Sequence, residues 1–290
     1  VARQQGAVLV GKTVSTEFAT FQPNQTRNPL RLTHTPGGSS SGSAAAVADS
    51  MVPLAIGTQT AGSLIRPASY CGIVAFKPSF GCIARAGAKL LSDTLDTVGT
   101  MARTVPDAAL FAAAMSSRHT WLVKPLNELL SRPLRIGICR TYEWDQAGAD
   151  TQNALANAER LLKKERIFEV KDLKLPTDFE TLAKAQTQVQ LFEQAHNLAH
   201  EHIAHFERLS PRLQGILQIG KDVTHAQYDA ALHHIDRCRQ QLQTVFQDVD
   251  VLLAPSAQGE APENLENTGD RKSTRLNSSH MSESRMPSSA

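Results

Sequence analysis

The sequence lacks most of the features that mark secreted, membrane-spanning or metal-clustering proteins. It has only four cysteines, and none of them forms a C-x-x-C pair: Cys71, Cys82, Cys139 and Cys238. This pattern argues against a disulfide scaffold or a thiolate zinc site and favours a reducing, cytoplasmic setting. No apolar run reaches the roughly 18 residues of a membrane span. The amino terminus lacks the charged-then-apolar pattern of a signal peptide.

An excess of charge of either sign is also missing. The 290 residues contain 30 Lys and Arg against 28 Asp and Glu, which gives a formal charge of +2. This charge is too small to capture nucleic acid or acidic membranes electrostatically, so we expect neither partner. The length is enough for one large domain or two ordinary ones with a buried core.

Composition divides the chain into four zones. Residues 1–119 are rich in Gly, Ala, Ser and Thr and carry short apolar runs, which indicate a packed α/β unit. Residues 120–248 change to long polar–apolar patterns that predict amphipathic helices covering one side of a sheet. Residues 249–269 begin with an apolar run before Pro255, which indicates a return to the sheet.

Periodicity and turn signals place the individual elements of this α/β fold. Strands are predicted at residues 7–10, 72–76, 134–139 and 249–254. Helices are predicted at residues 43–48, 106–115, 150–164, 179–209 and 225–246.

The last zone, residues 270–290, has many Ser residues and no apolar periodicity that could bury a face. Its beginning, DRKSTRLNSSH, resembles the in-frame translation of a widely used short-read sequencing adapter. We therefore expect an artefactual, disordered tail and exclude it from reasoning about the fold. A natural Ser-rich tail is the alternative.

Two short motifs match catalytic or nucleotide-binding patterns without the context that these need. Residues 6–13, GAVLVGKT, fit G-x-x-x-x-G-K-[ST], but the Ala-Val-Leu-Val between the glycines prefers a strand to a phosphate-wrapping loop. Residues 38–42 fit G-x-S-x-G around Ser40. The approach through Pro36 and Gly37 indicates a loop, whereas a nucleophile elbow needs a strand there.

Four histidines cluster along one predicted helix: His196, His200, His202 and His205. The pair His200-Glu201 followed by His205 misses the zinc-protease pattern H-E-x-x-H by one residue. That spacing puts the two rings on different helix faces. Histidines on a polar helix face are usually just exposed, so we expect no metal site.

The most specific signal is the Gly/Ser-rich segment at residues 36–81. A flexible linker would not carry VPLAIG and CGIVAF in its middle. We interpret the segment as two Gly-rich turns, each presenting a Ser, on either side of a helix and a strand. Ser39 stands in the first turn after two glycines, and Ser63 in the second after Thr-Ala-Gly.

This segment resembles the amidase signature family. The flanking blocks at residues 11–19 and 96–105 match the family too, and residues 250–269 are similar to its later strand and loop. The resemblance covers residues 1–269, is strongest over residues 11–107 and is weakest through the helical middle. It implies an amidase-signature fold, a large mixed β-sheet covered by helices, which is incomplete in this chain.

The resemblance also implies a mechanism and its residues. Family members hydrolyse amides with a Ser, a second Ser in a cis peptide, and a Lys. By motif position, Ser63 would be the nucleophile, and Ser39, after a cis bond from Gly38, would relay a proton between the Lys and Ser63. The oxyanion hole would be formed by the backbone N–H groups of Thr60, Ala61, Gly62 and Ser63. The implied substrate is a small-molecule amide, without a metal or an organic cofactor.

Three residues depart from the commoner family pattern. Gln59 and Ala61 stand where that pattern has Asp and Gly, and Arg66 falls three residues after Ser63 instead of two. These variants resemble one bacterial amidase branch and argue against the tRNA-dependent amidotransferase subunit, whose turn is Gly-Gly-Ser. We expect Arg66 to pack and to form hydrogen bonds, with no catalytic role.

The family's Lys lies further upstream of the first Ser than the 38 residues that precede Ser39 here. Lys12 is the only Lys in that stretch, and it belongs to the later GKT block. The chain also begins at Val1 instead of Met. We therefore expect a fragment that lacks the catalytic Lys and the final strands and is inactive and poorly stable alone.

Other functions stay open. The protein could be a specialised family member that hydrolyses a urea-derived amide, or a non-catalytic scaffold that keeps the Ser turns for packing. Nucleotide binding ranks third. No motif fixes the oligomeric state, and a homodimer is one option.

Overall fold

The structure is a computed structural model that describes residues 1–116 and 132–269. The zone boundary expected at 119/120 and the Ser-rich tail at 270–290 lie outside these described residues. None of the described helices is long and apolar enough to cross a membrane.

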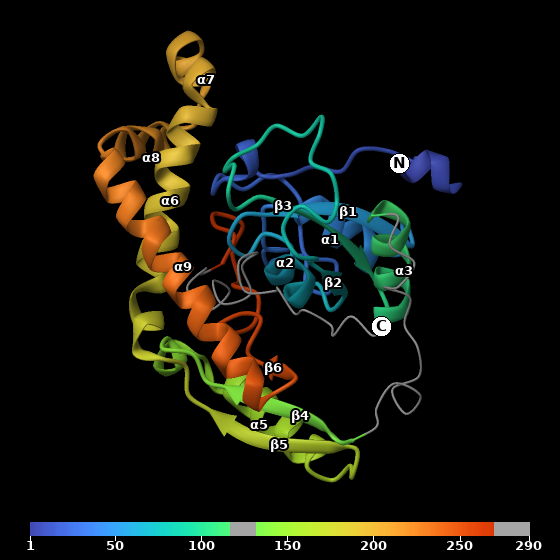
Figure 1. The fold of residues 1–290 in the computed structure, drawn as a ribbon. Helices are drawn as coiled ribbons and strands as arrows, with labels where there is room; N and C mark the ends of the chain where they lie inside the picture. The colour runs from blue at the N-terminus through green and yellow to red at the C-terminus, as the bar shows by residue number, and fades with distance from the viewer. Residues whose placement is uncertain (117–131, 270–290) are drawn as a thin grey trace.

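Three antiparallel strands form the first sheet, in the order β1-β3-β2 (Figure 1). They are β1 (Leu54–Gln59), β2 (Val74–Phe76) and β3 (Thr97–Ala102). The central strand β3 is buried at every position, so both faces of the sheet are covered there. The predicted strand at 72–76 is thus confirmed as β2, but it lies at an edge and leaves Phe76 36% exposed.

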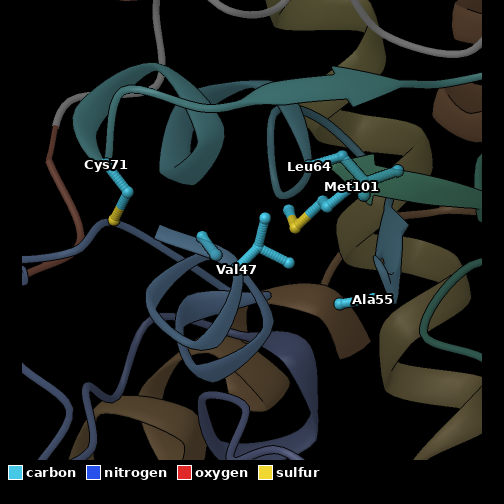
Figure 2. Packing of buried hydrophobic residues seen from close by; sticks show 6 residues of the cluster. Val47, Ala55, Leu64, Cys71 and Met101 are labelled. Carbon is cyan, nitrogen blue, oxygen red and sulfur yellow. The ribbon is translucent and has the colours of Figure 1, made fainter. Parts of the chain in front are cut away.

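Three helices accompany this sheet: α1 (Ser41–Ala48), α2 (Ile65–Tyr70) and α3 (Val105–Ser116). The predictions at 43–48 and 106–115 are confirmed by α1 and α3. Figure 2 shows the buried side chains gathered between α1 and the strands, among them Val47, Leu64 and Met101. The helix and strand expected between the two Gly/Ser turns are therefore α1 and β1, and they pack on each other around one apolar cluster.

Leu64 fits against the sheet because two opposite strand positions have no side chain. Gly57 of β1 faces Gly99 of β3 in the ladder. A Cβ at Gly99 would lie 2.6 Å from Leu64 Cδ1, and one at Gly57 would lie 2.8 Å from Leu64 Cδ2. This close approach fixes the start of α2, and with it the second Gly/Ser turn, on the sheet.

A second sheet is parallel, in the order β5-β4-β6. Its strands are β4 (Leu134–Cys139), β5 (Phe168–Leu173) and β6 (Val251–Leu253), and helix α5 (Ala149–Leu162) connects the first two. The predictions at 134–139, 150–164 and 249–254 are confirmed. Arg132 and Arg135 bind Asp250 just before β6 and hold the pKa of that carboxyl well below its usual value.

A helical layer lies beside both sheets (Figure 1). It consists of α6 (Leu182–Asn197), α8 (Pro211–Lys221) and α9 (His225–Asp248), with the short α7 (Ala199–Ala204) at one end. The prediction at 225–246 is confirmed by α9, which begins with a capping box of Thr224 and Gln227. Shorter 3-10 turns occur at Ala2–Gln5, Glu17–Ala19, Trp144–Gln146, Thr177–Thr181 and Phe206–Arg208.

The single helix predicted at 179–209 is wrong in its length. The chain leaves helical geometry at Leu198, between α6 and α7. Leu198 is fully buried in a cluster with Leu91 and Leu213, whereas α7 has no buried residue. The polar–apolar pattern continues through the break, so periodicity alone does not reveal it.

The strand predicted at 7–10 is also wrong. This segment has no regular structure, and Val8, Leu9 and Val10 are 86%, 67% and 76% exposed. An apolar run becomes a buried strand only where another element covers it, and no described strand pairs with these residues.

Candidate functional site

The two Gly/Ser turns meet in the structure. The backbone N–H of Ser40 donates to the carbonyl of Ser63 over 3.2 Å. Ser39 is 1% exposed and Ser63 is 9% exposed, so both serines are buried. The peptide bond between Gly38 and Ser39 is cis, as the resemblance implied.

The first turn is held by bonds from distant parts of the chain. The Arg66 guanidinium donates to the carbonyl of Gly38 over 2.6 Å, and the N–H of Thr16 donates to the carbonyl of Ser39 over 3.1 Å. A Cβ on Gly38 would lie 2.8 Å from the side chain of Thr268. These neighbours leave Ser39 little freedom to move.

Ser40 does not act as an elbow nucleophile in this geometry. A loop leads into it, and it is the N-cap residue of α1. Its hydroxyl exchanges hydrogen bonds with the backbone of Thr58 at the end of β1, at 3.2 and 3.3 Å. Ser40 thus ties the first turn to the strand that leads into the second.

The second turn is shaped by side chains on both of its flanks. The Gln59 side-chain carbonyl accepts the N–H groups of Leu64 and Ile65, at 3.0 and 3.1 Å. The Thr60 hydroxyl donates to Asp96 over 2.5 Å. Gln59, which stands where the commoner family pattern has Asp, therefore caps the first turn of α2.

Backbone donors collect where an oxyanion hole was predicted. Within residues 1–116 and 132–269, the N–H groups of Thr60, Ala61, Gly62 and Ser63 donate to no backbone carbonyl. Four adjacent donors of this kind in a tight turn can stabilise a developing negative charge. Arg66 packs and forms a hydrogen bond beside them, as predicted from its position.

Thiol groups do not compete with the serines as nucleophiles. Burial raises the pKa of Cys71 to about 12 and the pKa values of Cys139 and Cys238 to about 11. All four cysteines are unpaired. At neutral pH these three thiols are protonated and therefore weakly nucleophilic.

Lys12, which precedes the Gly/Ser-rich segment, and Lys77, which lies within it, differ in their environment. Lys12 is exposed on the irregular amino-terminal segment. Lys77 follows β2, is 9% exposed, and donates from Nζ to the carbonyl of Pro78 over 2.7 Å. Burial lowers the pKa of Lys77 to about 8, against the weaker opposite effect of Cys82.

This lowered pKa predicts a pH-dependent contribution to stability. The unfolded chain binds a proton at position 77 up to about pH 10.5 and the folded chain only up to about pH 8, so folding gains stability as pH rises between these values. From pH 7 to 10.5, the free energy of unfolding of the parent chain should therefore rise by up to about 3 kcal/mol relative to that of Lys77→Met. Urea denaturation of both proteins at each pH measures this difference. Lys12→Met is the control. Parallel stability curves for the parent and Lys77→Met would contradict the assignment.

The other sequence motifs do not form sites. No α-helix begins directly after residues 6–13, so they cannot act as a phosphate loop. The rings of His200 and His205 are 5.4 Å apart, but no group of three or more potential metal ligands occurs in the described residues.

A cavity of about 560 Å³ lies between α5, the end of α2 and the segment after β6. Arg31, His34, Tyr70 and Glu260 contribute to its wall, and neither Ser39 nor Ser63 lines it. It is therefore separate from the paired turns.

Sequence reasoning missed two carboxylates near the turns. Asp96 stands at the start of the DTVG block and accepts a hydrogen bond from Thr60. Glu193 on α6 accepts a hydrogen bond from Thr94, in the loop at residues 91–96 that ends with Asp96. Burial raises the pKa of Asp96, although its hydrogen bonds and Arg85 act in the opposite direction. Asp96 could have been noticed from its block, whereas Glu193 has no local signal because its partner Ser92 is 101 positions away.

Comparison with known proteins identifies the family of this chain. The family profile for Amidase matches residues 1–287. The chain belongs to the amidase family.

Particular relatives share this family. A glutamyl-tRNA(Gln) amidotransferase subunit of Neisseria meningitidis serogroup C is 32% identical, over 89% of this chain and 62% of its own length. A crystal structure described as an amidase matches with a TM-score of 0.85 at 27% identity, over 97% of this chain and 66% of that one. The native peptide amidase of Stenotrophomonas maltophilia matches with a TM-score of 0.74 at 25% identity, over 96% and 66%. The chain thus spans less than two thirds of these relatives' lengths.

Proposed function

We propose that the chain carries the nucleophile turns of an amidase that hydrolyses a carboxamide or another linear amide through a serine acyl-enzyme. One observation supports this most strongly: the bond from Ser40 N–H to Ser63 C=O joins a cis Gly38–Ser39 turn to a second turn whose N–H groups donate to no described backbone carbonyl. Membership of the amidase family and the likeness to peptide amidases support the same reaction.

In the proposed reaction, the Ser63 Oγ attacks the amide carbonyl carbon and passes its proton to the Ser39 hydroxyl, which passes its own proton to a general base. The N–H groups at positions 60–63 stabilise the oxyanion that forms. Ser39 passes a proton to the leaving nitrogen, the C–N bond breaks, and ammonia or an amine departs. Water then attacks the acyl-Ser63 ester, which releases the carboxylic acid and restores the hydroxyl.

A general base is needed for fast turnover, because a serine hydroxyl is a poor nucleophile without one. By resemblance this base is a Lys, and the sequence has only the exposed Lys12 before Ser39. We therefore propose that the 290-residue chain alone acylates slowly and turns over amides poorly. The unpaired cysteines support a cytoplasmic location.

The test uses acyl donors that need little help from a base. The chain is incubated with an activated p-nitrophenyl ester and, separately, with a fluorophosphonate, and the adducts are mapped by peptide mass spectrometry. We expect modification concentrated on Ser63, and ester acylation about a hundredfold or more faster than ammonia release from carboxamides or urea derivatives. Equal modification of exposed serines, in folded and heat-denatured chain alike, would favour the non-catalytic scaffold.

A second candidate is one component of a glutamyl-tRNA(Gln) amidotransferase, which the similarity to the Neisseria protein favours. Ala61 argues against it, because it replaces the first Gly of the Gly-Gly-Ser turn. Ammonia release from simple carboxamides without any partner protein would favour the amidase. Release from glutamine only with partner proteins would favour the amidotransferase.

A further inference from the structure

A buried carboxylate on α6 holds the loop at residues 91–96. Glu193 is 5% exposed, and it accepts the Thr94 N–H at 3.1 Å and the Thr94 hydroxyl at 2.8 Å. The hydroxyl of Ser92, which is fully buried, donates to it as well. From α9, the Tyr228 hydroxyl adds a further bond over 2.7 Å. Four donors thus satisfy a carboxylate that burial would otherwise strongly disfavour.

A second carboxylate, Asp96, holds the same loop and connects it to Thr60. Asp96 accepts the N–H groups of Leu91 and Ser92, at 2.7 and 3.1 Å, and the Thr60 hydroxyl at 2.5 Å. Ser92 therefore binds both carboxylates, Asp96 through its N–H and Glu193 through its hydroxyl. A short chain of hydrogen bonds runs from α6 to the turn that contains Ser63.

Apolar contacts attach the loop to the helical layer as well. Leu91 packs with Leu198 and Leu213, and Leu95 packs with Val189 and Ile235. These contacts would hold the loop without any carboxylate, because burial alone supplies the free energy. A buried, fully hydrogen-bonded carboxylate also fixes the orientation of the loop, since it accepts hydrogen bonds only from donors at defined positions.

We infer that Glu193 is a positioning residue for the turn at residues 60–63, acting through Ser92 and Asp96. The inference rests on the function proposed above, because it assigns to Glu193 the orientation of the oxyanion donors and of Ser63. Glu193 touches neither serine itself. Its effect passes to Thr60 through one loop.

The first test measures the turn directly, without any catalysis. Amide hydrogen exchange is followed by mass spectrometry in peptides over residues 58–68, where Leu64, Ile65 and Arg66 have bonded N–H groups. Glu193→Gln should speed exchange there and at residues 91–96 by about tenfold. Ser92→Ala, which removes only the hydroxyl link, should do the same. Faster exchange at 91–96 with unchanged exchange at 58–68 would overturn the inference.

A matched control separates positioning from general loosening. Glu159 on α5 is a half-buried carboxylate that binds Arg140 and Lys163 instead of this loop. Glu159→Gln should leave exchange at 58–68 unchanged. If Glu159→Gln and Glu193→Gln speed exchange there equally, Glu193 has no specific role.

The second test uses fluorophosphonate labelling of Ser63. A positioning role predicts that Glu193→Gln and Ser92→Ala lower the limiting labelling rate about tenfold or more and leave the half-saturating concentration within about twofold. A fall in binding with an unchanged limiting rate would contradict the inference. If the parent chain is not labelled at Ser63, the proposed function fails, and the exchange experiment still decides whether Glu193 positions the turn.

Discussion

Ser63→Ala is expected to abolish covalent labelling at position 63 and to lower hydrolysis of an activated ester about a hundredfold or more. The reason is that the acyl-enzyme forms on this one oxygen, so its removal leaves only the weak assistance of the oxyanion donors. Initial rates with an activated ester and intact-mass detection of the adduct measure both effects.

Ser39→Ala distinguishes the proton-relay role of Ser39 from the nucleophile role of Ser63. The substitution takes away the hydroxyl that accepts the Ser63 proton but leaves the nucleophile and the N–H groups at 60–63. Because the chain has only the exposed Lys12 upstream of the relay, labelling should persist at a rate about tenfold lower. The double variant should be no slower than Ser63→Ala alone, because residues that act in one step are not additive. Ser69→Ala, on the exposed side of α2, is the control and should match the parent. Unchanged labelling in Ser39→Ala would refute the relay.

Arg66→Leu is expected to destabilise the folded chain by about 2–4 kcal/mol. Arg66 is 1% exposed and donates to the Gly38 carbonyl over 2.6 Å, so the substitution leaves a buried acceptor without this donor and a space shaped for a longer side chain. Relief of the guanidinium's desolvation acts in the other direction. We expect the loss to be larger, since the site is already packed around the planar group.

The control for Arg66 is another arginine that also donates to backbone carbonyls. Arg212 is exposed and binds the carbonyl of Phe21 over 2.9 Å. Arg212→Leu should change stability by less than about 0.5 kcal/mol, because water replaces an exposed donor. Urea midpoints and slopes for both variants give the comparison. Equal stability of Arg66→Leu and the parent would show that the first turn does not depend on this bond.

The sequence predicts those parts of the fold that short-range signals determine. Helix α9 has a capping box and a regular apolar stripe, and the strand at 134–139 is a compact apolar run, so both are found where expected. The strand at 7–10 fails for the opposite reason. Its residues are apolar, but whether an apolar run is buried depends on the elements that pack beside it. The local sequence does not specify those elements.

The candidate site divides in the same way. The Gly-rich segment predicts two turns that each present a Ser, and the resemblance implies that the two serines act together. The structure brings the two turns into contact. Glu193 could not be found by spacing, because its partners are on a loop far away in the sequence. Hydrogen bonds between distant segments follow from packing, and packing is a property of the whole fold.

The neighbours of Gly38 bear on how the site assembles. Thr16 lies near the beginning of the described chain and Thr268 near its end, yet the side chains of both lie within 3.0 Å of where a Cβ on Gly38 would be. Loop closure over such a separation is entropically costly and is therefore a slow part of folding. The sheet and α1 can form from nearby residues, but the surroundings of Ser39 are complete only when the two distant segments have come together. Folding of the residues around Thr268 is therefore part of what encloses the first turn, as much as folding of the Gly/Ser-rich segment itself.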